Sequence, residues 1–190
     1  MRLRRRLENL YTADIQRDYE TLKDYLPNNA LAALDIGCGL GGINVFLYKH
    51  YQANGINLHL LDKDGIASKV YYGFNPEGAH YNSLALTGQF LRLNGVPDDR
   101  VTIHNVTKEG FPNRCKFDIV VSLLSWGYHY PVSTYVELVK ASLNPDGIVI
   151  MDIRNGTDGK DQLARHFSVC REIFVGLESN RRTLATNRSL

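Results

Sequence analysis

The glycine-rich segment LDIGCGLGGI, residues 34–43, joins an apolar run to a segment with helical character. Gly37, Gly39 and Gly42 have the G-x-G-x-x-G spacing of a dinucleotide-binding loop. Asp62 follows about 20 residues later, at the distance from such a loop where an acid binds the ribose hydroxyls. Taken alone, this spacing favours an enzyme that uses a nicotinamide or flavin cofactor.

A carboxylate precedes the same glycines, because Asp35 begins a D-x-G-x-G-x-G pattern. A dinucleotide would place its pyrophosphate against this turn, where exposed amides and a helix N-terminus stabilise negative charge. A neighbouring carboxylate would repel that pyrophosphate. S-adenosylmethionine carries an α-ammonium group and a sulfonium but no phosphate, and Asp62 would still bind its ribose. These residues therefore favour S-adenosylmethionine over a dinucleotide.

The segment SLLSWGYHYP, residues 122–131, combines three aromatic side chains with one histidine. It follows a predicted strand, so we expect it to line the crevice at the carboxyl ends of the strands. His129 is the candidate general base because an unperturbed histidine pKa of about 6.5 lies near working pH, although a packed loop histidine fits the pattern equally well. Tyr128 is assigned to the catalytic group with it. Trp126 and Tyr130 are assigned to the substrate side, with a core position as the alternative for Trp126.

The composition suits one domain of 190 residues that holds both segments. A net charge of +2 gives no electrostatic reason for a polyanionic partner, and the basic start MRLRRR is interpreted as a solvated helix face, with a phosphate-contacting patch as the alternative. The three cysteines have no CxxC spacing, so we expect neither disulfides nor a metal site. The sequence predicts a cytoplasmic protein without a membrane span.

Strand-like and helix-like segments alternate along the chain, which is typical of a parallel sheet covered by helices. The predicted strands are residues 31–36, 58–62, 101–106, 117–123 and 148–153, and the predicted helices are 15–26, 42–51, 81–94 and 134–143. Thr134 and Glu137 have the spacing of a capping box. We expect an N-terminal helical segment (1–30), a cofactor-binding core (31–153), and a closing helix and hairpin (154–190).

The segment GIASKVYYGFNPEGAHYN, residues 65–82, is longer than the usual connection between a strand and a helix. Long loops in compact domains are often lids or binding loops, so we predict that this segment forms part of a substrate lid. A plain surface insertion is the alternative. His80 and Tyr81, near its end, are assigned to the substrate side.

The segment ALDIGCGLGGINVFL resembles the first motif of class I S-adenosylmethionine-dependent methyltransferases. The resemblance continues, in the family's order and spacing, through LHLLDKD, RVTIHNV, FDIVVSLLSWGYHY and LNPDGIVIMDI. It implies a doubly wound, Rossmann-like α/β fold with a mostly parallel seven-stranded sheet, an antiparallel last strand and helices on both faces. It also implies methyl transfer with S-adenosyl-L-methionine as the cofactor.

The resemblance assigns cofactor-binding residues by position. They are Asp35, Gly37, Gly39, Gly41, Asp62, Asn105, Val106, Ser122 and Leu123. Asp62 would chelate the ribose hydroxyls. Asn105 replaces the Asp with which many relatives accept the adenine amino group, and its carbonyl can accept the same hydrogen bond. Ser122 and Leu123 would lie beside the transferable methyl group.

The near-neutral charge, the aromatic loop with its histidine and the lack of nucleic-acid-binding modules lead us to predict O-methylation of a small polar molecule. An RNA or protein methyltransferase that uses the basic start as a docking arm is one alternative. A non-catalytic subunit that keeps the cofactor fold is another. The sequence does not define an oligomeric state, and we expect no membrane partner.

Overall fold

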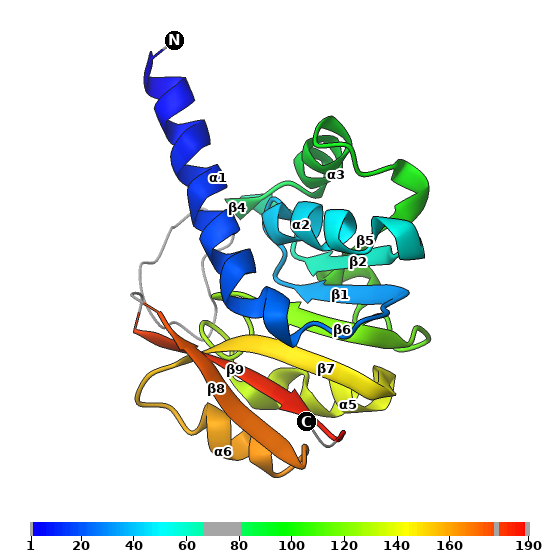
Figure 1. Ribbon diagram of the computed structural model, residues 1–190, viewed down its shortest axis with the longest axis vertical. Helices are drawn as coiled ribbons and strands as arrows, with labels where there is room; N and C mark the ends of the chain where they lie inside the picture. The colour runs from blue at the N-terminus through cyan, green and yellow to red at the C-terminus, as the bar shows by residue number, and fades with distance from the viewer. Residues whose placement is uncertain (1, 67–80, 177–178, 189–190) are drawn as a thin grey trace.

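A seven-stranded sheet organises the protein (Figure 1). The computed structural model describes residues 2–66, 81–176 and 179–188. The strand order is β5-β2-β1-β6-β7-β9-β8. The strands are β1 Ala32–Ile36, β2 Asn57–Asp62, β5 Val101–Asn105, β6 Phe117–Ser122, β7 Leu143–Arg154, β8 Val169–Val175 and β9 Asn180–Thr186. β9 pairs antiparallel with β7 and β8, whereas β5, β2, β1, β6 and β7 pair in parallel.

This topology confirms the predicted mostly parallel sheet with an antiparallel strand near its edge. Four of the five predicted strands end within one residue of their predicted bounds, because continuous apolar runs form strands that are covered on both faces. The fifth, β7, begins five residues earlier than predicted, at Leu143, which pairs with Phe117 before the register shifts.

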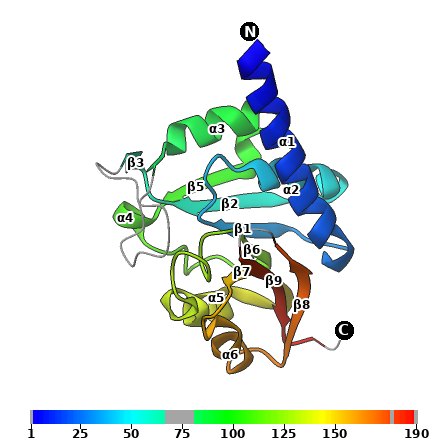
Figure 2. The ribbon, with the colours of Figure 1, turned by 90° about the vertical axis from the view of Figure 1, so that its left-hand side faces the viewer.

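Helices cover both faces of the sheet (Figure 2). On one face lie α1 (Arg2–Leu22), α2 (Gly42–His50) and α3 (Leu84–Leu93), and on the other lie α5 (Val136–Ser142) and α6 (Gly159–Ala164). A short helix, α4 (Val106–Glu109), directly follows β5. Single 3-10 turns lie at Lys23–Tyr25, Gln52–Asn54, Asp98–Arg100 and Val132–Thr134.

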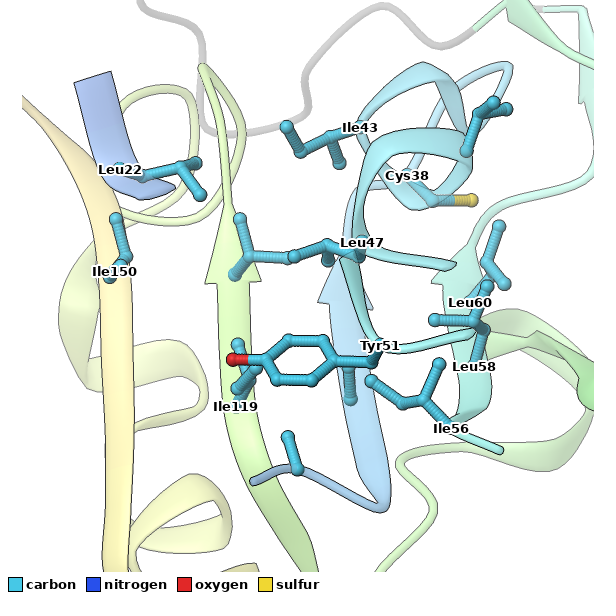
Figure 3. Close-up of a cluster of buried hydrophobic side chains, with 14 of the residues drawn as sticks. Leu22, Cys38, Ile43, Leu47, Tyr51, Ile56, Leu58, Leu60, Ile119 and Ile150 are labelled. Carbon is cyan, nitrogen blue, oxygen red and sulfur yellow. The ribbon is translucent and has the colours of Figure 1, made fainter. Parts of the chain in front are cut away.

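Each face of the sheet has its own apolar core. Beneath α1 and α2, Leu22, Leu47 and Tyr51 pack with side chains of the sheet such as Ile119 (Figure 3), and the Tyr51 hydroxyl donates a hydrogen bond to the Pro27 carbonyl. The core on the opposite face includes Leu34, Val120, Trp126, Val139 and Leu163. Burial of both faces removes a large apolar area from water, which is the main driving force for folding.

The helix boundaries differ from the predicted ones where a cap or a turn intervenes. Helix α1 begins at Arg2 instead of residue 15, because no Gly or Pro interrupts this first segment. Helix α3 begins after Ser83, whose hydroxyl accepts the Leu86 N–H at 3.4 Å. The predicted capping box of Thr134 was wrong: Tyr135 is the N-cap residue of α5, without a side-chain cap, because Thr134 belongs to a preceding 3-10 turn.

The two ends of the long insertion pair with each other. β3 (Gly65–Ile66) and β4 (Tyr81–Asn82) form a short antiparallel ladder, so the insertion leaves the fold and returns at one place. Residues 67–80 lie outside the described residues, so the predicted lid remains a prediction. Within the described ranges, none of the helices has the length and apolar character that a membrane crossing requires.

Candidate functional site

The carboxyl ends of the parallel strands enclose a cavity at one edge of the sheet. Its lining comes from the ends of β1 and β2, the start of α4 and the loop after β6, and consists of Ile36, Gly37, Leu61, Asp62, Lys63, Val106, Ser125, Tyr130 and Tyr135. The volume free of atoms is about 330 Å³, including space that is open to solvent. Open α/β sheets bind their ligands at this edge, where neighbouring connections leave the sheet in opposite directions.

The glycine loop between β1 and α2 forms one wall of the cavity. Gly37 has a φ of +75°, and its N–H donates to the Leu61 carbonyl at 2.7 Å. A Cβ on Gly37 would lie 1.9 Å from Ser125 Oγ, so the glycine is required both by its left-handed backbone and by the approach of the loop after β6. Gly39 and Gly41 also have positive φ, at +53° and +78°.

Asp62 lies at the end of β2 and faces the glycine loop. Its Oδ2 accepts the Gly39 N–H at 2.8 Å and Asn82 Nδ2 at 3.1 Å, and its Oδ1 accepts the Lys63 N–H at 2.7 Å. These donors orient the carboxylate along the cavity wall. The structure therefore places the predicted ribose-binding acid in the cavity, next to the glycines with which it was paired in the sequence.

Asp35 lies one residue before the cavity lining and is buried, with 3% exposure. Its Oδ2 accepts a hydrogen bond from Asn44 Nδ2 of α2 at 2.6 Å. Burial raises the pKa of Asp35 to about 7, and the negative charge of Asp62 adds to the increase against the effect of the Asn44 hydrogen bond. Asn44 Oδ1 is buried and has no hydrogen-bond partner among the described residues.

Asn105 is the last residue of β5, and Val106 begins α4. Val106 lines the cavity directly. Asn105 is 8% exposed, and its Oδ1 accepts the Thr107 N–H at 3.0 Å, which caps the short helix α4. Its carbonyl therefore already has one partner, and an adenine amino group would use the second lone pair of that oxygen.

Ser122 ties the end of β6 to β1 and is fully buried. Its hydroxyl donates to the Ile36 carbonyl at 2.7 Å and accepts the Trp126 N–H at 2.9 Å. Leu123 packs against the core beneath α2. Neither side chain is part of the cavity lining, and the Ser122 hydroxyl holds the loop that carries Ser125 through its bond to Trp126.

The assignment of Trp126 to the substrate side was wrong. Its side chain is fully buried in the core beside α5, and its indole Nε1–H donates to the Val132 carbonyl at 2.9 Å. The alternative of a core position is confirmed. A tryptophan can be buried in this way because its one polar atom has a partner.

Three neighbouring residues of the same loop face different surroundings. Tyr130 lines the cavity, with Lys63 Nζ 5.3 Å from the centre of its ring. Tyr128 lies 5.2 Å from the Arg154 guanidinium and contacts the edge of His129. The His129 N–H donates to the Ser125 carbonyl at 2.7 Å. Tyr128 and His129 are thus beside the cavity lining rather than part of it.

Five cavity residues were not predicted from the sequence as site residues: Ile36, Leu61, Lys63, Ser125 and Tyr135. Lys63 directly follows Asp62 in the motif LHLLDKD, and Ser125 lies within the segment that was singled out, so position alone could have indicated both. Tyr135 carried no local signal. His80 and the side chain of Tyr81 lie outside the described residues. Among the described residues, no group of three or more His, Cys, Asp and Glu side chains could hold a metal ion.

Comparison with known proteins gives structural matches only. No protein-family model and no curated protein matches the sequence. A precorrin-6y C5,15-methyltransferase from Geobacter metallireducens GS-15 is similar in structure, with a TM-score of 0.62 and 14% identity over 92% of this chain and 87% of its own. A putative O-methyltransferase from Nostoc punctiforme PCC 73102 has a TM-score of 0.65 and 15% identity over 94% of this chain.

A third similar structure is the T. thermophilus 16S rRNA N2 G1207 methyltransferase in complex with AdoMet and guanosine, with a TM-score of 0.63 and 16% identity over 89% of this chain. The chain spans only 57% of the Nostoc protein and 41% of the rRNA enzyme. Methyltransferases with different named activities thus share its arrangement of strands and helices. The chain has the fold of the class I S-adenosylmethionine-dependent methyltransferases.

Proposed function

We propose that this protein binds S-adenosylmethionine in the cavity beside the glycine loop and transfers its methyl group to a small polar acceptor. The observation that carries the proposal is Asp62, a carboxylate held on the cavity wall by the Gly39 and Lys63 amides. A carboxylate accepts hydrogen bonds from two adjacent hydroxyls, which is the chemistry needed to hold a ribose.

Asp35 supports S-adenosylmethionine over a phosphate-containing cofactor. Its carboxyl is buried beside the glycine loop, where burial opposes the charged form and raises its pKa to about 7. A bound ammonium would favour the charged carboxylate, whereas a pyrophosphate would disfavour it further. The buried Asn44 Oδ1 is a second acceptor near the same loop, and it has no hydrogen-bond partner within the described part of the chain. Both groups favour a cationic ligand over an anionic one.

The acceptor side of the cavity supports a small molecule with hydroxyl groups. Ser125, Tyr130 and Tyr135 supply hydroxyls to a lining that Ile36 and Val106 make apolar. Such a mixed wall can align an acceptor with the methyl group and exclude water, and alignment is the main requirement of a displacement reaction. S-adenosylmethionine supplies the electrophilic methyl group when bound.

His129 is the proposed general base for a hydroxyl acceptor. Its ring contacts Tyr128, in the loop that also supplies Tyr130 to the cavity lining. The three cysteines are free thiols, which fits the proposed cytoplasmic location because reducing compartments keep thiols unpaired.

Titration calorimetry with S-adenosylmethionine, S-adenosylhomocysteine and NAD tests the cofactor. We expect binding of the first two and none of NAD. NAD binding without a response to S-adenosylhomocysteine would overturn the proposal. Mass spectrometry of a metabolite extract incubated with enzyme and labelled S-adenosylmethionine then identifies the methylated product.

Replacement of His129 tests the base on that product. His129→Ala should lower turnover by about 10²–10⁴-fold with cofactor affinity unchanged, because a positioned base contributes about this factor. The activity of the parent should fall at acidic pH, because a protonated imidazole cannot accept the proton, and the variant should lack this decline. Tyr128→Phe, from the same loop, is the control and should change acceptor KM more than kcat. Parental turnover in His129→Ala would remove the histidine from the chemistry.

A further inference from the structure

We infer that the buried ion pair of Asp152 and Arg182 positions the loop after β6 and ties that loop to helix α1. The inference rests on the proposed function, because this loop (residues 123–130) supplies Ser125 and Tyr130 to the cavity. Asp152 and Arg182 are positioning residues in this arrangement, since neither lines the cavity.

The ion pair joins two neighbouring strands inside the protein. Asp152 on β7 and Arg182 on β9 are direct partners in the antiparallel register. Arg182 Nε donates to Asp152 Oδ1 and Arg182 Nη2 to Asp152 Oδ2, both at 2.9 Å, and the two side chains are 0% and 2% exposed. The cost of removing both charges from water can offset their attraction, so the net stability of the fold does not by itself explain a buried pair of this kind.

The carboxylate of Asp152 also holds the loop after β6. Its Oδ2 accepts the Leu124 N–H at 3.2 Å. Leu124 has a φ of +54°, a left-handed conformation that is strained for a non-glycine residue and persists only where neighbouring groups impose it. Leu124 directly precedes Ser125, whose side chain fills the space above Gly37. Asp152 therefore helps to set the backbone that presents Ser125 to the cavity.

A second set of contacts fixes the same loop on β7. The Gly127 carbonyl accepts the Arg154 N–H at 3.0 Å, and a Cβ on Gly127 would lie 2.9 Å from the Asp152 carbonyl oxygen. The loop thus rests directly on the end of β7. A displacement of Asp152 would be transmitted to both ends of the Leu124–Gly127 segment.

Arg182 connects this arrangement to α1. Its Nη2 donates to Asp18 Oδ1 at 2.9 Å, and its Nη1 donates to the Asp18 carbonyl and to the Thr21 hydroxyl. Leu22, the last residue of the helix, lies beside Ile150 of β7 (Figure 3). One guanidinium therefore joins the end of α1 to the carboxylate that holds Leu124.

Helix α1 also contacts the start of α2, directly after the glycine loop that forms the opposite wall of the cavity. The Tyr11 hydroxyl packs against Gly42, the first residue of α2, because a Cβ on Gly42 would lie 2.6 Å from it. The helix thus contacts the start of α2 directly and reaches the loop after β6 through Arg182 and Asp152. Its docking sets the separation of the two walls between which cofactor and acceptor are proposed to bind.

The test replaces the pair without leaving an unpaired charge. In Asp152→Leu/Arg182→Leu, two apolar side chains fill the interior, and such exchanges are often neutral for stability. We expect the amides of residues 124–130 to exchange hydrogen at least 10-fold faster than in the parent, with the exchange of β6 and β2 unchanged. Unchanged loop exchange in a folded double variant would overturn the positioning role.

The link to α1 is tested from the helix side. Asp18→Asn/Thr21→Val keeps Asp152 and Arg182 but removes contacts of Arg182 to α1, and we expect faster exchange in the same loop amides. Arg181→Gln, the neighbouring arginine on β9 that pairs with Glu172 at the surface, is the matched control and should leave the loop unchanged. Parental loop exchange in Asp18→Asn/Thr21→Val would overturn the link.

Binding of S-adenosylhomocysteine to the parent separates this inference from the proposed function. If the parent fails to bind it, the proposed cofactor is wrong, but the exchange results still decide whether the pair positions the loop. If the parent binds it, we expect the double leucine variant to lose the protection that the ligand gives to residues 124–130. Full protection in that variant would contradict the positioning role.

Discussion

Replacement of Gly37 by alanine would add a methyl group to space that Ser125 already occupies. The new Cβ would lie 1.9 Å from Ser125 Oγ and 2.3 Å from Ser125 Cβ, on a residue with a φ of +75°. Gly39 provides a matched control in the same loop. It has a φ of +53°, but a Cβ there meets nothing within 4 Å. The two alanine variants therefore share the backbone cost and differ in the steric overlap.

The expected magnitudes follow from these two contributions. Gly39→Ala should cost only the left-handed backbone term, about 1–2 kcal/mol. Gly37→Ala adds the cost of overpacking, typically about 1–3 kcal/mol, which gives a total of about 2–5 kcal/mol. In a domain of this size each kcal/mol lowers Tm by about 2–4 °C. Gly39→Ala should therefore lower Tm by about 2–8 °C, and Gly37→Ala by about 4–20 °C.

Thermal unfolding followed by circular dichroism, with a double-mutant cycle, provides the measurement. Ser125→Gly removes both overlapping atoms, so Gly37→Ala should cost much less in that background than in the parent. Ser125→Ala keeps the Cβ at 2.3 Å and should not relieve the overlap. Equal losses in Gly37→Ala and Gly39→Ala, or no relief from Ser125→Gly, would refute the assignment of the clash.

Three further predictions concern the carboxyls of Asp62 and Asp35 and the imidazole of His59. Asp62→Ala should weaken S-adenosylhomocysteine binding by about 2–3 kcal/mol, or about 30–150-fold, and Asp62→Asn should weaken it by less because one acceptor remains. Calorimetry measures both affinities. If both variants bind as tightly as the parent, the ribose is bound elsewhere. Because a bound ammonium favours the charged form of Asp35, whose pKa is about 7, affinity should rise between pH 6 and 8, and Asp35→Asn should abolish the rise. Stability should depend on pH through Asp35 and His59 with opposite signs. Burial raises the pKa of Asp35, so the contribution of Asp35 to the free energy of unfolding declines as pH rises from 3.8 to about 7. Burial lowers the pKa of His59 to about 4, so the contribution of His59 declines as pH falls from 6.5 to about 4. Urea unfolding between pH 4 and 6.5 measures how the free energy of unfolding changes with pH. The slope should be more positive in Asp35→Asn than in the parent and less positive in His59→Phe. Parental slopes in both variants would contradict the assignment.

The residue pattern alone predicted the five parallel strands and one wall of the cavity, whereas the full seven-stranded sheet with its antiparallel last strand was implied by the family resemblance. Apolar runs predicted five parallel strands, because burial on both faces demands continuous hydrophobic sequence. The glycine spacing and Asp62 predicted the cavity wall near the proposed cofactor. The glycine loop and Asp62 lie at the ends of adjacent strands, and their positions depend mainly on local geometry. These features are encoded over short stretches of the chain.

Packing alone decided which residues of the loop after β6 face the cavity. The aromatic segment indicated a site, but its sequence could not show that Trp126 turns into the core while Ser125 meets Gly37. Arg182 carried no local signal either. Its burial depends on Asp152 in the neighbouring strand and on Asp18, 164 positions earlier in the chain. Contacts between such distant residues exist only once the sheet has brought its strands together and α1 has docked on it, because no short-range pattern determines the direction of a side chain in a packed interior.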